Sequence, residues 1–476
     1  MGDYSIIETT GNLDIEIKGL NNDSRHVKKG YIFIAMKGYR TNGHIYIEDA
    51  IKNGAICIIH EENCIKKEGI IYMKVKDTVD ALAYLSNIYY DQPWSKLEMI
   101  GVTGTNGKTT VTHFIKEILE NYGMRTGLIG TLGLIMEGKK SPLNNTTPDI
   151  RVIVDSLNKM IDKNINTCIM EVSSHSLALD RVKGIKYDIG IFTNLTKDHL
   201  DYHEDMESYF QSKLLLFKNT ERFNIINMDD PYGKEILNIL PNKSYKTYGI
   251  IEEADIIARD IIYNINGVNF NVEYKGCKIP IKINIPGKFS VYNALASIAC
   301  SLALDIPLEI ISTSLEKVEA VKGRFEVLPI DKKYSIIIDF AHTPDGLNNV
   351  LTVINEFAKG KVIVVFGAGG DRDKSKRSIM GEVVGSLSDY AIVTSDNPRT
   401  EKPKNIINDI LVGINKTNVE FKAIIDRKKA IKYAIDIARD NDIILLAGKG
   451  HEEKMIIGKK TIYFNEREIV HQFIKD

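Results

Sequence analysis

The segment Gly101-Val-Thr-Gly-Thr-Asn-Gly-Lys-Thr-Thr110 combines residue types that bind phosphate groups. An apolar run from Leu97 to Val102 leads into it, and a helical pattern from Thr109 to about Asn121 follows it. In a strand, loop and helix of this kind, backbone N–H groups and the helix N-terminus hold phosphate oxygens. The segment therefore predicts a site for a nucleoside triphosphate. The expected nucleotide contacts within it are Gly104, Thr105, Asn106, Gly107, Lys108, Thr109 and Thr110.

Two side chains of this loop have distinct expected roles. Lys108 is placed to reach the terminal phosphates, and the hydroxyl group of Thr109 to bind a magnesium ion. The loop departs from the strict G-x-x-x-x-G-K-T pattern, because Val102 occupies the position of the opening glycine. The chain instead reads G-x-x-G-x-x-G-K-T from Gly101. A chance glycine loop is the alternative, but the flanking strand and helix favour binding of ATP with magnesium.

A carboxylate is expected beside the loop. Glu171 follows an apolar strand at 167–170. The carboxyl end of a strand near a phosphate loop is a favourable place for a magnesium ligand. Capping of the following helix is the alternative role for this glutamate.

His199 and Lys213 are two further candidates. His199 comes just after the strand expected at 187–193, where ligands gather, although a lone histidine there is more often structural. Lys213 lies among apolar residues on the helix expected around 206–218. Its ammonium group has only donors and cannot bind a metal, and its stem could simply extend along apolar surface. Carbamylated by carbon dioxide, Lys213 would become an anion that could bind one.

The composition is typical of a soluble globular protein, with 43% hydrophobic and 26% charged residues among 476. A net charge of -1 gives no electrostatic footprint for nucleic acid or an anionic membrane. The sequence shows no signal region and no apolar stretch long enough to span a membrane. Five scattered cysteines lack the spacing of a metal cluster. We expect a cytoplasmic protein without nucleic-acid or membrane partners.

Length and pattern predict an α/β protein of three domains. Residues 1–95 alternate short strands with helices, form a small α/β domain, and end near the linker Asp91-Gln-Pro-Trp94. Residues 96–328 form a central domain with a parallel sheet like that of P-loop ATPases, including a β-rich excursion over 254–285. Residues 329–476 alternate strands and helices regularly, which predicts a Rossmann-like, doubly wound parallel sheet.

Within residues 329–476, a helix is expected to begin with Thr343 as its N-cap and Pro344 at its first position. The expected strands are Ser335–Asp339, Lys361–Phe366, Tyr390–Thr394, Phe421–Ile425 and Ile443–Ala447.

A series of short motifs runs through all three expected domains. Besides the phosphate loop, Lys213 and Asn293, they are Asp23-Ser-Arg25, Asn145-Thr-Thr-Pro-Asp149, Glu171-Val-Ser-Ser-His175, Asn194 to His203, Gly323-Arg324, Asp339-Phe-Ala-His342, Gly370-Asp-Arg-Asp373, Asp396-Asn-Pro-Arg399 and Gly448-Lys-Gly-His-Glu452. In this order and spacing the motifs resemble the Mur ligase family, ATP-dependent enzymes that form amide bonds in peptidoglycan precursors. The similarity covers the whole chain and is greatest to the members that add the third residue of the stem peptide.

The resemblance implies the catalytic and metal-binding residues. Thr109 and Glu171 correspond to ligands of one magnesium ion. Carbamylated Lys213 and His199 correspond to ligands of a second. The residues implied in catalysis are Lys108, Lys213 and His199.

The resemblance also implies contacts to two substrates. Asn293 corresponds to an adenine contact, and Arg324 and Asp339 to residues around the ribose and phosphates of ATP. Leu179 departs from the family pattern, since a glutamine is common there, so that contact must be absent or replaced. Contacts to UDP-N-acetylmuramoyl-L-Ala-D-Glu are implied for Ser24, Asn145, Thr146, Thr147, Ser173 and Arg181.

The sequence Asp396-Asn-Pro-Arg399 bears on the amino acid that is added. Pro398 fixes a turn after the strand at 390–394, and Arg399 presents a planar fork suited to a carboxylate. In the family this sequence accompanies meso-diaminopimelate, which has a carboxylate and an ammonium group at its far end. A solvated loop arginine is the alternative for Arg399. The implied amino-acid contacts are Arg372, Asp396, Asn397, Pro398, Arg399, Gly448 and Glu452, with Glu452 on the ammonium group.

The implied reaction is ATP-dependent ligation of meso-diaminopimelate through an acyl phosphate, and three alternatives compete with it. Addition of L-lysine is disfavoured by Arg399, because the lysine-adding versions lack this arginine. A ligase like folylpolyglutamate synthetase would lack both the N-terminal segment with Asp23-Ser-Arg25 and the diaminopimelate loop. A nucleotide-gated scaffold without catalysis is disfavoured by the complete set of implied catalytic residues.

Overall fold

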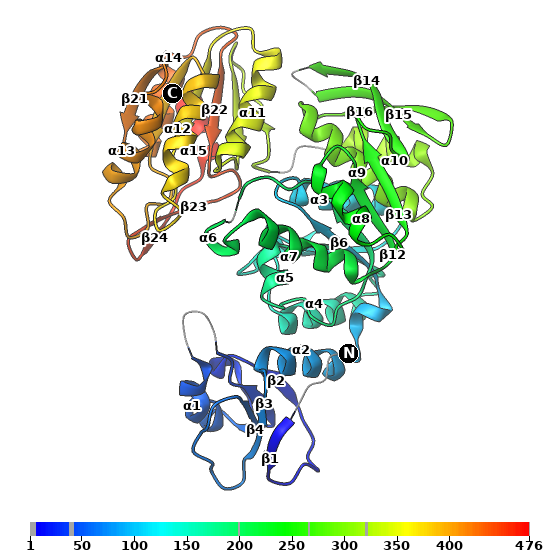
Figure 1. The fold of residues 1–476 in the computed structure, drawn as a ribbon. Helices are drawn as coiled ribbons and strands as arrows, with labels where there is room; N and C mark the ends of the chain where they lie inside the picture. The colour runs from blue at the N-terminus through cyan, green and yellow to red at the C-terminus, as the bar shows by residue number, and fades with distance from the viewer. Residues whose placement is uncertain (1–5, 38–41, 199, 265–266, 319–321, 476) are drawn as a thin grey trace.

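The computed structural model describes residues 6–37, 42–198, 200–264, 267–318 and 322–475. In these residues three large β-sheets follow one another along the chain, each covered by helices (Figure 1). The N-terminal sheet lies below the central sheet in this view, and the C-terminal sheet lies beside the central one at the upper left. The predicted α/β class is confirmed, whereas the boundaries at 95 and 328 stay a prediction.

The first sheet has the order β1-β5-β4-β3-β2 and is parallel except at its edge strand β1. Two helices accompany it, α1 (Ile47–Lys52) and α2 (Thr78–Tyr89). Asp77 caps α2, since its carboxylate accepts the Val79 N–H at 2.7 Å. The strands are β1 (Ile6–Thr10), β2 (Gly19–Asn21), β3 (Tyr31–Ile34), β4 (Ala55–His60) and β5 (Ile71–Val75).

The chain leaves this sheet at the predicted linker. Asp91 and Gln92 both have left-handed backbone conformations, with φ of 52° and 47°. A short 3-10 helix, η3 (Pro93–Lys96), then leads into the central sheet. The proline and the two left-handed residues together explain why α2 ends here.

The central sheet has the predicted parallel core, and the β-rich excursion predicted over 254–285 extends one of its edges. In the described residues its order is β16-β15-β14-β13-β12-β11-β6-β10-β7-β8-β9, parallel from β14 to β7 and antiparallel in the hairpins at both edges. Antiparallel strands need only short turns, such as the left-handed Lys275 and Gly276 between β15 and β16. The strands are β6 (Glu98–Thr103), β7 (Thr126–Gly130), β8 (Gly133–Met136), β9 (Lys139–Ser141), β10 (Thr167–Glu171), β11 (Tyr187–Phe192), β12 (Thr220–Asn227), β13 (Tyr245–Gly249), β14 (Ile256–Asn264), β15 (Gly267–Tyr274) and β16 (Cys277–Ile283).

Helices cover both faces of the central sheet. Alternate side chains of β6 point to opposite faces: Ile100 and Val102 join the core beneath α3 and α9, and Met99 joins the core shared with α4 and α7. The helices are α3 (Lys108–Asn121), α4 (Ile150–Asp162), α5 (Ser174–Ala178), α6 (Leu200–His203), α7 (Met206–Lys218), α8 (Pro231–Ile239), α9 (Lys288–Ala303) and α10 (Leu308–Lys317).

The C-terminal sheet is doubly wound, as predicted. Its order is β17-β18-β22-β19-β20-β21. The short edge strand β17 is antiparallel to β18, and the other five strands are parallel to one another. In β18, Ile337 faces the core beneath α11 to α13, and Ile336 and Ile338 face the core beneath α14 and α15. The strands are β17 (Glu326–Val327), β18 (Ser335–Asp339), β19 (Val362–Phe366), β20 (Tyr390–Thr394), β21 (Glu420–Ile424) and β22 (Ile443–Ala447).

The helices of the C-terminal region include the predicted one that begins at Pro344, where Thr343 accepts the Gly346 N–H at 3.1 Å. A hairpin of β23 (Lys454–Ile457) and β24 (Lys460–Tyr463) was not predicted. The helices are α11 (Pro344–Phe357), α12 (Ser375–Leu387), α13 (Pro403–Ile414), α14 (Arg427–Ile437) and α15 (Glu466–Lys475). None of the helices in the described ranges is both long and apolar enough to cross a membrane.

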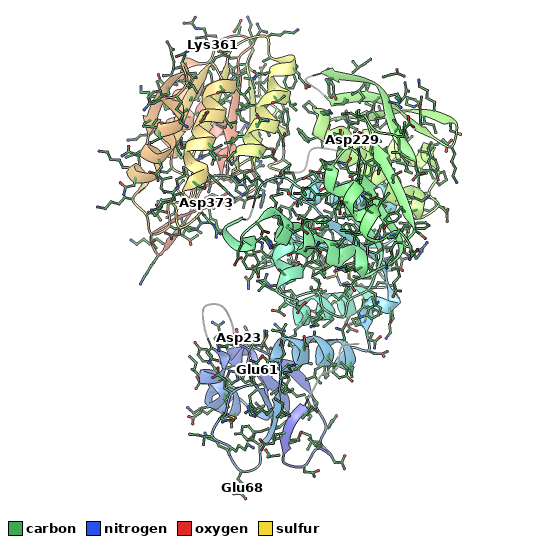
Figure 2. All side chains as sticks on the ribbon, in the orientation of Figure 1. Asp23, Glu61, Glu68, Asp229, Lys361 and Asp373 are labelled. Carbon is green, nitrogen blue, oxygen red and sulfur yellow. The ribbon has the colours of Figure 1, made fainter. Side chains whose placement is uncertain are left out.

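The carboxyl ends of the C-terminal strands face the central domain. Figure 2 shows Lys361, just before β19, at the far end of this sheet, and Asp373, in the loop after β19, at the end next to the central domain. The same figure shows Asp23 on the side of the N-terminal sheet that faces the central domain. Ligand-binding loops of α/β sheets gather at such carboxyl ends.

Candidate active site

The phosphate loop connects β6 to α3, as predicted. Gly107 has a left-handed φ of 87°, and a Cβ atom there would collide with Asn293 Oδ1. A Cβ atom at Gly104 would collide with Thr193 Oγ1, which donates to the carbonyl oxygen of Asn106 at 2.7 Å. Both positions require glycine because neighbouring side chains pack directly against the loop. Asn293, predicted to contact adenine, therefore lies against the phosphate loop.

Lys108 is the first residue of α3 and folds back over its own loop. Its Nζ atom donates to the carbonyl oxygens of Gly104 at 2.7 Å and Thr105 at 2.9 Å. Burial lowers the pKa of Lys108, and the nearby Glu171 carboxylate opposes that effect. The ammonium group thus lies at the helix N-terminus, where phosphate oxygens are best stabilised.

Glu171 lies fully buried at the carboxyl end of β10, beside Thr109. The Thr109 hydroxyl donates to Glu171 Oε2 at 3.0 Å, and Thr131 donates to the same carboxylate from its backbone N–H at 2.9 Å and its hydroxyl at 3.0 Å. Gly130 leaves the space that the carboxylate fills. The two predicted ligands of the first magnesium are therefore in contact, and their oxygen atoms suit this ion.

The residues predicted to contact the dipeptide gather around Thr147. Its hydroxyl donates to the carbonyl oxygen of Glu171 at 2.8 Å and accepts the Ser173 N–H at 3.1 Å. Arg181 Nη1 reaches the Thr147 carbonyl oxygen at 3.4 Å. Thr147, Ser173 and Arg181 thus form one cluster that adjoins the magnesium ligands.

Two other predicted positions differ in their surroundings. Thr146 Oγ1 lies 3.1 Å from Thr131 Oγ1, which places Thr146 at the edge of the Glu171 site. Asn145 is exposed, and the structure does not bring it into this cluster. Leu179, the predicted departure from the family pattern, is 41% exposed at the end of α5.

Lys213 projects from α7 and is almost completely buried. Its Nζ atom lies 4.6 Å from the centre of the Tyr209 ring, and the Tyr209 hydroxyl lies 3.1 Å from Thr105 Oγ1 in the phosphate loop. Burial lowers the pKa of Lys213 well below its usual range, and the charge of Lys108 adds to that effect. His199, its predicted partner, lies outside the described residues.

Protein metal ligands are sparse here. Within the residues that the structure describes, no group of three or more His, Cys, Asp or Glu side chains could hold a metal ion. The predicted first site contains one carboxylate and one hydroxyl group. This set fits magnesium, which commonly binds one or two protein oxygens together with phosphates and water.

Arg324 and Asp339 lie together near the junction of the central and C-terminal sheets. The Arg324 guanidinium lies 4.7 Å from the centre of the Phe340 ring, and its Nε is buried and has no hydrogen-bond partner among the described residues. Asp339 accepts the N–H groups of Phe325 at 2.6 Å and Ala341 at 2.7 Å. Burial raises the pKa of Asp339, and Arg324 opposes this shift. A buried donor without a partner suits a ligand oxygen.

The predicted amino-acid loop follows β20 and closes around Lys449. This fully buried ammonium group lies 2.9 Å from Glu452 Oε2 and 3.3 Å from both Asp396 Oδ1 and Asn397 Oδ1. Asn397 Nδ2 also donates to Glu452 Oε2 at 2.8 Å. Gly448 leaves room for the Asp396 carboxylate, 3.1 Å from where a Cβ atom would lie. The structure brings these predicted contacts together.

Arg399, at the other end of this loop, and Arg372, in the loop after β19, both have side-chain atoms next to Gly369. Arg399 has a left-handed φ of 50°, and its Nη1 atom donates to the carbonyl oxygen of Gly370 at 2.6 Å. The position that a Cβ atom of Gly369 would take lies 2.9 Å from Arg399 Nη1 and 3.6 Å from Arg372 Cγ. Burial and then the charge of Arg372 lower the pKa of Arg399. Two arginines close enough for this charge effect are suited to an anionic ligand.

Polar side chains join the C-terminal and central domains. Asp345, in the first turn of α11, accepts from Asn106 Nδ2 at 2.8 Å and Thr196 Oγ1 at 3.0 Å. Lys376 on α12 donates to Asp198 Oδ1 at 2.8 Å. The phosphate loop and the segment before His199 are therefore both in contact with the domain that carries the amino-acid loop.

Ser24 lies apart from these clusters, on a 3-10 helix of the N-terminal sheet. It is buried, and its carbonyl oxygen accepts from Asn53 Nδ2 at 2.9 Å. A neighbouring cavity of about 450 Å³ extends to α4 of the central domain. Its lining has more basic than acidic side chains, with Lys18, Arg25, Lys28 and Arg151 against Asp155, and it includes the aromatic rings of Tyr31, Tyr89 and Tyr90.

Sequence reasoning did not single out Lys449 or Asp345. Lys449 stands inside a predicted motif, but a lysine between glycines gives no sign of complete burial. Asp345 directly follows the predicted helix start at Pro344, where an acidic residue is expected for the helix alone. Their roles depend on contacts with distant segments of the chain.

Comparison with protein families gives three matches that together extend over most of the chain. Residues 16–90 match the model described as "Mur ligase family, catalytic domain". Residues 102–301 match "Mur ligase middle domain", and residues 323–450 match "Mur ligase, glutamate ligase domain".

Similar proteins cover the same length. A protein from Caldanaerobacter subterraneus subsp. tengcongensis named UDP-N-acetylmuramoyl-L-alanyl-D-glutamate–2,6-diaminopimelate ligase is 45% identical, over 98% of this chain and 97% of its own. A protein of the same name from Clostridium tetani is 46% identical, over 100% and 98%.

Solved structures agree in fold. A structure of a 2,6-diaminopimelate ligase with the same name is 30% identical, with a TM-score of 0.71 over 98% of this chain and 97% of that one. A MurF ligase from Thermotoga maritima in complex with ADP has a TM-score of 0.65 at 20% identity, over 96% of each chain. With relatives so similar over nearly its whole length, this chain belongs to the Mur ligase family.

Proposed function

We propose that this protein is an ATP-dependent ligase that joins meso-diaminopimelate to UDP-N-acetylmuramoyl-L-Ala-D-Glu in cytoplasmic peptidoglycan precursor synthesis. The observation that carries this proposal is the pair Arg372 and Arg399, adjacent to each other beside a loop that contacts Glu452. This arrangement offers cations to a carboxylate and an anion to an ammonium group, the two groups at the far end of diaminopimelate. Relatives named as diaminopimelate ligases support it.

The three domains divide the substrates between them. In this proposal residues 1–95 bind the uridine diphosphate near Ser24, where the cationic and aromatic cavity would suit a nucleotide diphosphate. Residues 96–328 bind ATP through the phosphate loop, with Asn293 at the adenine. Arg324 and, from the end of β18 in the C-terminal domain, Asp339 lie around the ribose and phosphates. Residues 329–476 bind the amino acid.

In the first step the free γ-carboxylate of the D-glutamate attacks the terminal phosphorus of ATP, which gives an acyl phosphate and releases ADP. Lys108 and the N-terminus of α3 stabilise the negative charge on the phosphates. Thr147, Ser173 and Arg181 position the dipeptide next to Glu171. Thr109 and Glu171 would hold magnesium, which supplies positive charge where two anions approach each other.

Lys213 has a different proposed role. Its Nζ atom is buried beside the Tyr209 ring, in the region of the phosphate loop. As a carbamate it would complete, together with His199, the ligands for a second magnesium ion. We expect Lys213→Ala to lower turnover by several orders of magnitude and small carboxylic acids to restore some of it. A folded variant without any such rescue would contradict the carbamate.

In the second step an amino group of diaminopimelate attacks the acyl carbon, and inorganic phosphate leaves as the amide forms. Glu452 and the two arginines orient the amino acid by its far end, so that its reacting amino group enters from the C-terminal domain. The polar contacts of Asp345 and Lys376 with the central domain support this approach. Such positioning makes a bimolecular step effectively unimolecular.

The test is phosphate release from ATP with UDP-N-acetylmuramoyl-L-Ala-D-Glu, in the presence of meso-diaminopimelate, L-lysine or no amino acid. We expect release with diaminopimelate, and a preference over lysine on the order of 10⁴ because the arginines would lack a partner carboxylate. Equal release with lysine would support the ligase activity but would contradict the assignment of diaminopimelate as the amino acid that is added. Absence of release with both would reject the proposed reaction.

A further inference from the structure

A buried arginine lies behind the loops that carry Arg372 and Arg399. Arg377, on α12, is 1% exposed, which makes it one of the most deeply buried charged side chains of the described protein. Its guanidinium forms a bidentate pair with Glu401, with Nη2–Oε1 at 2.7 Å and Nη1–Oε2 at 3.0 Å. Nη2 also donates to the carbonyl oxygen of Gly369 at 3.2 Å. Arg377 therefore binds the loop after β19 directly and the loop after β20 through Glu401.

Glu401 continues this connection. Its Oε1 atom accepts the backbone N–H of Asp371 at 2.6 Å, so one carboxylate binds both Arg377 and the residue next to Arg372. Arg377 holds the pKa of Glu401 at about 2, and the carboxylate stays ionised throughout the neutral range. A charge-assisted pair of this geometry is among the stronger hydrogen-bonded contacts in proteins.

A second set of hydrogen bonds joins the two loops, and in it the accepting carboxylate belongs to the loop after β19. The Asp371 carboxylate accepts from the Thr400 hydroxyl at 2.7 Å and its N–H at 3.2 Å. The Gly370 N–H donates to the Asn397 carbonyl oxygen at 2.9 Å. A Cβ atom at Gly370 would collide with Pro398, so the loops touch along their backbones. Together these contacts fix one loop on the other.

This fixation opposes a repulsion. Arg372 and Arg399 extend from the two loops to the same place, and the positive charge of Arg372 lowers the pKa of Arg399. Without a bound anion, loops that are free to move would separate the two charges. The contacts of Arg377 and Glu401 hold the two loops together and thereby oppose this separation.

We propose that Arg377 and Glu401 are positioning residues that keep the two-arginine carboxylate site assembled before the amino acid binds. The inference rests on the proposed function, since it assumes that Arg372 and Arg399 bind the far carboxylate of diaminopimelate. Neither positioning residue is among the proposed amino-acid contacts, and both act through the loops that carry the two arginines. Their effect is to make binding independent of loop ordering, which would otherwise weaken the affinity for diaminopimelate.

Asp409 provides a matched control. It lies on α13 and accepts from the same guanidinium, with Arg377 Nη1–Oδ2 at 2.9 Å, but its carboxylate forms no hydrogen bond with either loop in the described structure. Asp409→Asn and Glu401→Gln each remove one carboxylate charge from Arg377. The first leaves the loop connection in place and the second weakens it.

The experiment compares wild type, Glu401→Gln, Arg377→Lys and Asp409→Asn by steady-state kinetics and thermal unfolding. The KM for meso-diaminopimelate and the KM for ATP are measured separately. For Glu401→Gln and Arg377→Lys we expect the KM for diaminopimelate to rise about tenfold, the lower end of the effect that loss of a supporting partner has at metal sites. We expect the KM for ATP to stay within about twofold, and Asp409→Asn to stay within about twofold for both substrates.

The outcomes separate this inference from the proposed function. A wild-type protein that releases no phosphate with diaminopimelate rejects the proposed function and the inference with it. An active wild type overturns the inference alone if Asp409→Asn raises the KM for diaminopimelate as much as Glu401→Gln does. An equal rise in both KM values for Glu401→Gln also overturns it, because a general loss of structure would do the same. If Arg377→Lys does not fold, Glu401→Gln and Asp409→Asn decide the question.

Discussion

Replacing Lys449 by methionine removes a positive charge from a wholly buried position next to two carboxylates. The ammonium group contacts Glu452 at 2.9 Å and Asp396 at 3.3 Å, and the side chain of Asp396 is 8% exposed. Removing one partner of a buried ion pair typically costs about 3–5 kcal/mol, because the remaining charge stays desolvated. Glu452 is 27% exposed and can recover some hydration, so we expect the lower end, about 3 kcal/mol.

Scanning calorimetry measures this effect, since a chain of several domains need not unfold in one transition. For a domain of about 150 residues, 3 kcal/mol corresponds to a fall in Tm of about 6–12 °C. Lys416→Met is the control, because its pair with Glu382 is exposed on both sides and should contribute at most about 1 kcal/mol. A Glu452→Gln change should restore some of the loss in the Lys449→Met background. A fall in Tm equal to that of the control would refute the view that Lys449 neutralises buried carboxylates.

Three further predictions concern single residues. Arg399→Lys should raise the KM for diaminopimelate by about 10- to 100-fold, since a lysine cannot form the bidentate contact; an unchanged KM in steady-state assays would contradict this. Gly107→Ala should nearly abolish ATP binding, measured by calorimetric titration, because its Cβ atom would collide with Asn293 Oδ1 at a left-handed φ. Burial and the charge of Arg324 lower the pKa of His451 to about 4, below its ordinary 6.5, so the unfolded chain binds a proton first. Stability should therefore fall as the pH is lowered from 6.5 to 4, and a His451→Gln variant should show a flatter denaturation profile over that window.

Most of the correct predictions rest on residues that are close together in the sequence. The strand, loop and helix around Lys108, the cap at Thr343 and the bounds of helix 206–218 depend on residues close in the sequence, and the structure confirms these three elements. The Asp396-to-Arg399 loop was placed correctly because its flanking strand is a continuous apolar run. Glu171 and Thr109 could be paired because strand ends in a parallel sheet meet at one edge.

The missed features depend on distant contacts. The alternation over 254–285 indicated strands, but it contains no register information that would distinguish an antiparallel hairpin at a sheet edge from a separate unit. Lys449 and Arg377 look like ordinary surface cations in the sequence, and the complete burial of Lys449 follows from partners that are up to 53 residues away. The contact of Asp345 with Asn106 could not be predicted for the same reason, since the two residues are 239 positions apart in the sequence. Charge burial of this kind is a tertiary property.

The position of Arg372 and Arg399 has an evolutionary consequence. Both arginines follow adjacent strands, β19 and β20, of the C-terminal sheet, whereas the phosphate loop belongs to the central sheet. On the proposed function, mutations that alter which amine is accepted can therefore accumulate in these two neighbouring loops without changing the phosphate loop. The choice of amino acid could then change while the phosphate loop stays the same. A lineage could change the composition of its cell wall through the C-terminal domain alone.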